Sequence, residues 1–448
     1  MSFRRRVLWS ALGLPVALFV TPVLPPGPPS WAMGSPGDPV NATTESSTCF
    51  WRGPVDATHV NNAFPDTAVT YWTATISLPA GSRLGITGEF PHSRSMSFNA
   101  YDATGVATDH IDDAAIVPAR GSTDPFLSGA DRNATRRTYH VTVLDQVPSG
   151  QTPPNTLAAG VSGQHTQVLI YRVYVPDKGK DPTGGVGLPQ VSVTLANGTV
   201  STGNAMCKAV HAEKGFPPSQ KFPLATYLSL RDQPGQLPTF PALNPPVFWR
   251  AFDVTALVGC IYRGSCGGTP ELNPGQYSNL DNAYVVAAVN RGFSAGPVLV
   301  LHGKMPTTPS TYDRNSVMRS GTQLRYWSLC QNESLATTRV GACLYDEQVP
   351  LDKDRNYTIV SSLPSDRPVN ARAACGVGWI PWPTRGDGAG HREDAMLIVR
   401  NMLPAPGFAA AIQDVSRPGR ETQVMGSYLP VGRYTTKASF QALGCPPA

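Results

Sequence analysis

The chain has 448 residues, a length that suits two or three domains, each able to bury a core of its own. Charged residues make up only 15% of it, whereas glycine (42) and proline (44) are abundant, which favours a turn-rich β protein over a helical one. The net charge of +5 is small for this length and no basic helix or stripe is visible, so the composition argues against nucleic acid as a partner.

The N-terminus has the pattern of an export signal. Arg4-Arg5-Arg6 precedes a mostly apolar run from Val7 to Val20, and Ser30-Trp31-Ala32 offers a small-x-small cleavage site. The sequence therefore predicts a signal peptide at 1–32, a flexible lead-in at 33–48, and a secreted or cell-envelope protein. An uncleaved membrane anchor is the alternative. No other stretch is long and apolar enough to span a bilayer, so any membrane contact is expected through this segment.

Five blocks of sequence recur in the same order, which predicts an internal duplication. The second block ends at Gly-x-[Phe/Met]-Pro in both copies, and the fifth reads Leu-Ile-x-Arg-x-x-x-Pro in both. The alternative is that unrelated β domains share short apolar runs ending in proline, but the common order weighs against it. The paired blocks are Tyr71–Ile76 with Tyr284–Val289, Leu84–Pro91 with Leu299–Pro306, Met96–Tyr101 with Leu324–Leu329, Tyr139–Val143 with Tyr357–Val360, and Leu169–Pro176 with Leu397–Pro404.

The blocks alternate polar and apolar residues, as strands do when one face of a sheet is buried. We expect an all-β fold of two tandem related β-sandwich (jelly-roll-like) modules, at 49–200 and 276–448, joined by a Pro-rich connector at 201–275. Smaller expectations are a long loop at 109–137, a short helix near Ala205–Glu213, a helical turn at Phe408–Asp414 and an exposed Gly-rich loop at 383–392.

Eight cysteines in an exported chain predict disulfides, although eight cysteines allow 105 connectivities. Position along the chain suggests one bridge that closes a short loop, one across a hairpin, one around the first module and one that ties back the C-terminus. A metal site is the alternative, but no Cys-x-x-Cys or Cys-x-x-His spacing occurs. The suggested pairs are Cys49–Cys207, Cys260–Cys266, Cys330–Cys343 and Cys375–Cys445.

Two groups of residues are candidates for binding. Asp109, His110, Asp112 and Asp113 could hold a divalent ion, the alternative being a solvated loop. Arg172 and Arg400 occupy the same place in the fifth block. They could clamp an anion or ligand at the interface of the modules, or make a contact that both copies of the fold share.

Trp379 and Trp382 lie beside two prolines and could form a rigid, partly exposed edge that binds a glycan or lipid, although aromatic strands are more often core. Gly292–Gly296 matches the Gly-x-Ser-x-Gly pattern of hydrolases, which requires a strand-to-helix turn. A second strand follows it here, so we interpret it as a hairpin turn. No catalytic residue is assigned, and no cofactor motif is present.

Two blocks, Arg325–Leu329 and Leu169–Pro176, resemble the uncharacterised bacterial family called domain of unknown function 1214. That family has an aromatic-Trp-Ser-Leu strand and a later strand ending Arg-x-Tyr-x-Pro. The second module departs from the pattern, with Asn401-Met402 in place of the Val-Tyr pair. The resemblance implies a β-sandwich and no established activity, so it implies no catalytic residue.

The leading functional hypothesis is a non-catalytic envelope or extracellular protein. It would bind a small molecule, glycan or lipid near the junction of the modules, and no cofactor is expected. A secreted hydrolase with its site in the 109–137 loop is the first alternative, and a purely structural surface protein is the second.

Overall fold

The structure of the chain is a computed structural model. The expected signal peptide at 1–32 and lead-in at 33–48 lie outside the described residues, as does Ser294 of the Gly-x-Ser-x-Gly pattern. The described residues are 49–145, 152–160, 166–217, 219, 221–268, 270–293, 297–313, 318 and 321–445.

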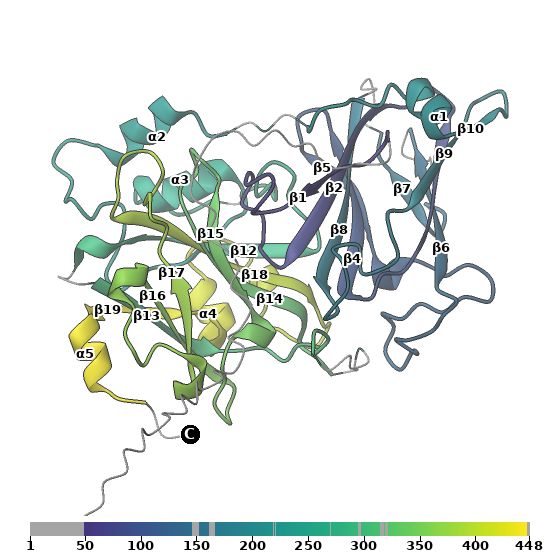
Figure 1. Ribbon diagram of the computed structural model, residues 1–448. Helices are drawn as coiled ribbons and strands as arrows, with labels where there is room; N and C mark the ends of the chain where they lie inside the picture. The colour runs from purple at the N-terminus through teal and green to yellow at the C-terminus, as the bar shows by residue number, and fades with distance from the viewer. Residues whose placement is uncertain are drawn as a thin grey trace, which may run out of the picture. The chain divides into compact units, whose positions relative to one another are not determined.

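The first module is a β-sandwich of two five-stranded sheets (Figure 1). Their strand orders are β1-β2-β8-β4-β5 and β10-β9-β3-β6-β7. β6 and β7 pair in parallel, and the other neighbours pair antiparallel. The strands are β1 (Arg52–Val55), β2 (Val69–Ser77), β3 (Arg83–Glu89), β4 (Ser93–Asp102), β5 (Ala107–Asp112), β6 (Thr138–Leu144), β7 (Thr156–Ala158), β8 (Thr166–Pro176), β9 (Gln190–Thr194) and β10 (Val200–Thr202).

The second module repeats this plan with one strand fewer. Its sheets have the orders β11-β12-β18-β14-β15 and β17-β16-β13-β19, and β16 and β17 form the parallel pair. The strands are β11 (Trp249–Arg250), β12 (Asn282–Asn290), β13 (Pro297–Lys304), β14 (Leu324–Asn332), β15 (Val340–Tyr345), β16 (Asn356–Ser362), β17 (Val377–Pro381), β18 (Asp394–Pro404) and β19 (Val431–Thr436).

The common topology confirms the duplication expected from the sequence. Adding ten to each strand number in the first sheet of module one gives the first sheet of module two. The register agrees as well, because Arg172 faces Tyr71 and Ser97 across its neighbours, and Arg400 faces Tyr284 and Ser328. The chain therefore contains two copies of one β-sandwich.

A tyrosine explains the glycine that ends the second block in each copy. Gly88 pairs with Tyr139 across β3 and β6, and Gly303 pairs with Tyr357 across β13 and β16. A Cβ atom built on Gly88 would lie only 2.6 Å from the Tyr139 hydroxyl, and one built on Gly303 would lie closer still to the Tyr357 hydroxyl. Each tyrosine ring lies over the glycine backbone, so both residues are needed together.

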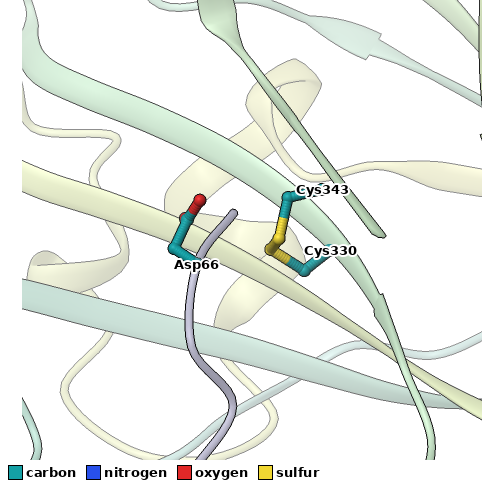
Figure 2. A group of neighbouring side chains, drawn as sticks. All are labelled: Asp66, Cys330 and Cys343. Atoms are coloured by element: carbon teal, nitrogen blue, oxygen red, sulfur yellow. A yellow bond between two sulfur atoms is a disulfide. The ribbon is translucent and has the colours of Figure 1, made fainter. Parts of the chain in front are cut away.

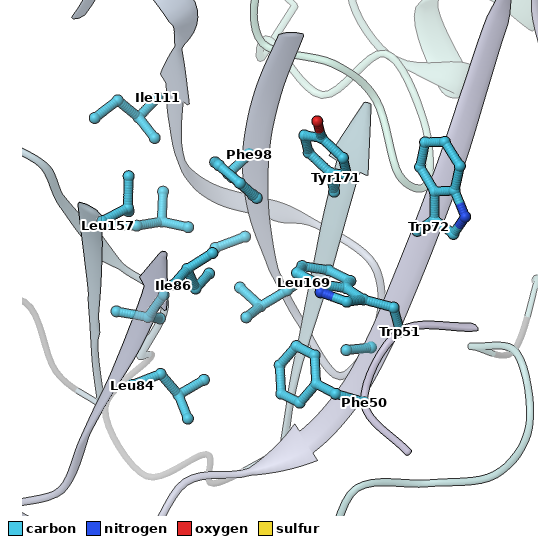
Figure 3. Close-up of a cluster of buried hydrophobic side chains, with 14 of the residues drawn as sticks. Phe50, Trp51, Trp72, Leu84, Ile86, Phe98, Ile111, Leu157, Leu169 and Tyr171 are labelled. Atoms are coloured by element: carbon cyan, nitrogen blue, oxygen red, sulfur yellow. The ribbon is translucent and has the colours of Figure 1, made fainter. Parts of the chain in front are cut away.

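Each sandwich encloses its own apolar core. In the first module, side chains from both sheets meet, with Leu84 and Ile86 from one and Phe98, Leu169 and Tyr171 from the other (Figure 3). The equivalent core of the second module includes Leu299, Leu301, Trp327 and Leu397. Burying the apolar surface of these side chains stabilises the fold by roughly 25 cal/mol per Å² and is the main favourable contribution to folding.

β4, β8, β14 and β18 are buried along nearly their whole length rather than on alternate residues. One face of each packs in a sandwich core. The other face packs at the junction of the two modules, where Tyr174 and Tyr326 meet edge to face with ring centroids 5.3 Å apart, except that Met396 and Ile398 of β18 pack against the connector. Residues 45–448 accordingly form one compact unit.

The connector contains more structure than the sequence suggested. α1 covers Gly203–Ala209 and ends before the predicted Glu213, because His211 has a positive φ of 48°. α3 begins after Asp253, whose side chain accepts a hydrogen bond from the Ala256 N–H. β11 lies within the expected connector yet pairs with β12, so the second module begins earlier than residue 276. The helices are α1, α2 (Leu224–Arg231), α3 (Val254–Tyr262), α4 (Glu421–Met425) and α5 (Lys437–Ala442).

Three further expectations are corrected in detail. The 109–137 segment is not a single loop, because residues 107–112 form β5 and Asp113–Ala115 form a 3₁₀ turn, η1. The Gly292–Gly296 segment does not join a hairpin, since β12 and β13 belong to different sheets. The expected turn at Phe408–Asp414 is a 3₁₀ turn over Ile412–Asp414.

The four disulfides pair the cysteines as position along the chain suggested. They indicate a protein of an oxidising compartment. In the part of the chain that the structure describes, no helix is both long enough and apolar enough to cross a membrane. The disulfides are Cys49–Cys207, Cys260–Cys266, Cys330–Cys343 and Cys375–Cys445.

Candidate functional site

The junction of the modules is held by two reciprocal ion pairs. Arg94 on β4 contacts Asp346 of the second module, with Nη1 3.0 Å from Oδ1. Arg325 occupies the same position on β14 and contacts Asp113 of the first module at 2.6 Å. Each aspartate also accepts a backbone N–H from the strand of its own module, Met96 for Asp113 and Trp327 for Asp346. The same surface of each copy therefore meets its counterpart.

Burial makes these pairs energetically demanding. Desolvation raises the pKa of both Asp113 and Asp346, although the arginine beside each draws it back down. Arg94 is fully buried and also donates to Glu347 and to the Thr311 hydroxyl. Such a network is satisfied only when both modules are in place.

Arg172 and Arg400 lie at this junction, as the sequence suggested, and both are buried. Arg172 donates to the Tyr101 hydroxyl at 2.6 Å and to the Tyr277 carbonyl, in the segment before β12, at 2.8 Å. Arg400 donates to the Phe64 carbonyl, in the equivalent segment before β2, at 2.7 Å. The protein itself supplies these acceptors, as expected for a contact that both copies share. The guanidinium NH2 groups that would clamp a ligand are already hydrogen-bonded.

The four candidate metal ligands at 109–113 are engaged separately. Asp109 accepts the Ala158 N–H, and Asp112 accepts two N–H groups at the start of η1. Asp113 is in the inter-module ion pair, and His110 lies 3.2 Å from Asp281. Their side chains therefore stabilise the local fold and the junction.

The two tryptophans of the expected exposed edge differ in their surroundings. Trp382 is 1% exposed and belongs to the core of the second module. Trp379 is half-buried, its indole N–H donates to the Ser362 hydroxyl, and the Arg367 guanidinium lies 4.3 Å from its ring. They form no common exposed aromatic surface.

Asp66, Cys330 and Cys343 bring together three groups of metal-binding type (Figure 2). The two sulfur atoms are joined in a disulfide, so neither is a thiolate ligand. Asp66 accepts a hydrogen bond from the Ser328 hydroxyl and lies 3.6 Å from Arg400. This group is part of the junction.

A pocket of about 500 Å³ lies where the connector covers β12, and we call it the connector pocket. The connector folds over this place because α3 buries Leu257, Val258 and Ile261 in a cluster shared with β12 and β18. Aromatic and apolar side chains dominate the lining, and a few polar groups accompany them. The lining residues are Gln233, Gln236, Leu237, Thr239, Phe240, Pro241, Ala242, Leu243, Val247, Trp249, Cys260, Ile261, Tyr262, Arg263, Gly264 and Ala288.

A group of polar side chains lies behind the wall formed by Pro241, Tyr262 and Ala288. We call it the Asp–His cluster, and its members are Tyr227, Asp232, Asp387, His391 and Asp394. The Tyr227 hydroxyl on α2 donates to Asp387 at 2.9 Å. His391 contacts Asp387 through Nδ1 at 2.6 Å and Asp232 through Nε2 at 2.8 Å. The connector is thus fastened to the 383–392 loop, which is packed against the protein rather than fully exposed.

Asp394, at the start of β18, completes the Asp–His cluster. It is buried and accepts hydrogen bonds from Arg231 and Asn290. Burial raises the pKa of the Asp394 carboxyl group and of the Tyr227 hydroxyl. Burial alone would lower the pKa of His391, but its hydrogen bond to Asp387 raises it.

Sequence reasoning missed the Asp–His cluster and the pocket. Asp387 and His391 lie in the segment interpreted as an exposed Gly-rich loop, and Asp394 lies three residues before the fifth block, at the start of β18. The spacing Asp-x-x-x-His-x-x-Asp was the available signal. Tyr227 could not be linked to them, since it is 160 residues from Asp387 in the sequence.

Comparison with known proteins finds weak similarity to solved structures. No family model and no curated protein matches the chain. Among solved structures, an uncharacterized protein from Burkholderia cenocepacia is 12% identical, with a TM-score of 0.47 over 87% of this chain and 82% of that one. A structural genomics target from Vibrio parahaemolyticus is 10% identical, with a TM-score of 0.40 over 87% and 92%. The resemblance to domain of unknown function 1214 stays a hypothesis.

Proposed function

We propose that this chain is an exported binding protein that takes up a small amphipathic molecule in the connector pocket. The observation that carries the proposal is the pocket itself. Its volume of about 500 Å³ falls within the range of roughly 300–1,000 Å³ found for small-molecule sites. The structure supplies this pocket in the connector, away from the module junction where the sequence had suggested binding.

The pocket walls define the chemistry of the ligand. Phe240, Trp249 and Tyr262 provide aromatic surface for an apolar body. Leu237 and Leu243 also line the pocket, yet they are 71% and 50% exposed, so apolar surface extends to solvent. Gln236 offers hydrogen bonds to a polar end, and Gln233 offers its side-chain oxygen, since its NH2 group already donates to the Leu230 and Tyr262 carbonyls. A lipid-like molecule or a glycan with an apolar substituent fits this description.

The disulfides support an extracellular or envelope location for this activity. Cys260, which lines the pocket, is bonded to Cys266 just beyond the end of α3. A bridge of this kind persists in an oxidising compartment. Together with the basic and apolar N-terminal pattern, it favours a secreted or cell-envelope protein.

The test is native mass spectrometry of the mature protein from the envelope or secreted fraction of its own host. We expect extra mass that disappears on denaturation. Replacing Ala288 by Trp should fill the pocket and abolish the extra mass, because Ala288 lies in its wall. Ala196→Trp, at an exposed turn between β9 and β10, is the matched control and should retain it.

A second readout uses a defined probe. The fluorescent dye 1-anilinonaphthalene-8-sulfonate should bind the wild-type protein and Ala196→Trp, and bind Ala288→Trp at least about tenfold more weakly. A bare native mass together with equal dye binding by both variants would refute the proposal. Unfolding transitions of both variants establish that they fold.

A further inference from the structure

We propose that Asp387, His391 and Asp394 form a binding site for a divalent transition-metal ion, for which Zn²⁺ is the best match. The proposal does not depend on the connector pocket, because the Asp–His cluster lies on the far side of the wall that the two share. It assigns a function to buried charged groups that neither the module junction nor the pocket uses.

The three side chains converge closely enough for one ion. One ligand atom from each lies within 4.8 Å of the others. Asp387 and Asp394 are 1% and 5% exposed, so the oxygen ligands are already withdrawn from water. Tyr227, Asp387 and Asp394 line a small cavity that has room for about one water-sized guest, whereas His391 is not part of its lining.

A buried carboxylate oxygen in the same cavity points independently to a positively charged guest. Glu333 is 6% exposed and lines the cavity with Asp387 and Asp394. Among the described residues, its Oε2 has no hydrogen-bond partner. The nearest cations, Arg339 and Arg385, approach only Oε1, at 3.9 and 4.0 Å. A buried carboxylate oxygen without a partner is costly, and a bound ion or its water would supply one.

The surroundings are those that orient metal ligands in proteins. A metal-binding histidine usually donates its second ring N–H to a carboxylate, and Nε2 of His391 faces Asp232 at 2.8 Å. Ligating carboxylates are themselves hydrogen-bonded, as Asp387 is by Tyr227 and Asp394 by Arg231 and Asn290.

When the metal ion binds, it replaces a proton as the positive partner of Asp387. In the metal-free protein, Nδ1 of His391 contacts Oδ2 of Asp387 at 2.6 Å. An ion bound by Nδ1 takes the place of the proton between these atoms, and that proton passes to solvent. Asp387 therefore keeps a cationic neighbour, and Nδ1 and Oδ2 move apart on binding, because two metal–ligand bonds of about 2.0–2.2 Å at a near-tetrahedral angle place their outer atoms farther apart than 2.6 Å.

The donor set selects the metal. One imidazole nitrogen with two carboxylates suits Zn²⁺ or, less well, Mn²⁺, whereas Ca²⁺ and Mg²⁺ prefer oxygen ligands throughout. Glu333, which lines the same cavity as the two aspartates, would reach the ion through a water molecule. The structure thus assigns a mixed nitrogen and oxygen site.

The experiment uses tag-free mature protein, stripped with a chelator and dialysed. Isothermal titration with ZnCl₂ should give one ion per chain, and Zn²⁺ should raise Tm by roughly 3 °C at saturating concentration. CaCl₂ should give neither effect. His391→Gln should weaken Zn²⁺ binding by at least about a hundredfold, and Glu333→Gln by about tenfold. Glu393→Gln, beside Asp394 but half-exposed, is the control and should bind as the wild type does.

Several results would overturn the proposal. They are the absence of stoichiometric Zn²⁺ binding, a Ca²⁺ response equal to that of Zn²⁺, and unchanged affinity in His391→Gln. If His391→Gln fails to fold, Glu333→Gln decides, because removing a buried charge there should preserve the fold. Equal Zn²⁺ affinity in Glu333→Gln and wild type then counts against the site.

Discussion

The strongest prediction concerns the ion pair between Arg94 and Asp346. Replacing Arg94 by Ala leaves Asp346 and Glu347 at the junction without their guanidinium partner. Because Arg94 is 0% exposed and Asp346 1%, solvent cannot take over its role. Removing one member of a buried pair costs about 3–5 kcal/mol, and we expect the free energy of unfolding to fall by this amount.

The assay is equilibrium unfolding in urea, followed by tryptophan fluorescence, with thermal unfolding as a second measure. A loss of this size lowers Tm by about 5 °C in a protein of this length. The transition should also broaden or split, because the two modules no longer unfold as one unit. Arg325→Ala should behave similarly through Asp113, since it occupies the equivalent position.

A double-mutant cycle tests the reasoning directly. Asp346→Ala alone should also destabilise the protein, but the double variant should lose at least about 1 kcal/mol less than the two single losses together. Lys178 and Asp313 form an exposed ion pair between the modules at 2.8 Å, and Lys178→Ala should leave the stability unchanged. Additive losses in the cycle, or an Arg94→Ala loss below about 1 kcal/mol, would show that the pair does not hold the junction.

Two further predictions follow from the fold. Gly303→Ala should lower the free energy of unfolding by about 1–3 kcal/mol in urea unfolding, because its Cβ would collide with the Tyr357 ring. A neutral effect would mean that the ring moves freely. Burial raises the pKa of Asp281 to about 6, even though His110 acts to lower it. The folded state therefore binds this proton more tightly than the unfolded state, and stability should fall by at most about 3 kcal/mol as the pH rises from about 4 to about 6. Asp281→Asn should abolish this part of the pH dependence, and an unchanged profile would contradict the assignment.

The sequence was informative where local pattern decides structure. The five repeated blocks became β2, β3, β4, β6 and β8 and their counterparts. β3 and β6 show the alternating burial that leaves a period in the sequence, whereas β4 and β8 are buried along nearly their whole length and were recognised by repetition. The repeated Arg172 and Arg400 lie at the module interface, where the ligand-clamp interpretation placed them, but their partners are those of the alternative, a contact that both copies share.

The sequence was uninformative where distant segments create the environment. Asp113 was grouped with its neighbours as a candidate metal ligand, yet its decisive partner is Arg325, 212 residues away. Trp382 was expected near the surface, but β17 directs it into the core. The Asp–His cluster likewise joins Tyr227 and Asp232 of the connector to the segment that contains Asp387 and His391, so the local spacing shows only part of it.

The duplication also explains where new function can arise. The junction uses the same residues of both copies, so a change at Arg94 or Arg325 weakens a contact on which both modules depend. The connector has no such constraint, because its α2 and α3 precede β12 whereas only residues 49–68 precede β2 within the described chain. The connector pocket and the Asp–His cluster both form where this additional segment packs against the second module. We therefore propose binding sites where the two copies differ, whereas the equivalent surfaces of the two copies hold the modules together.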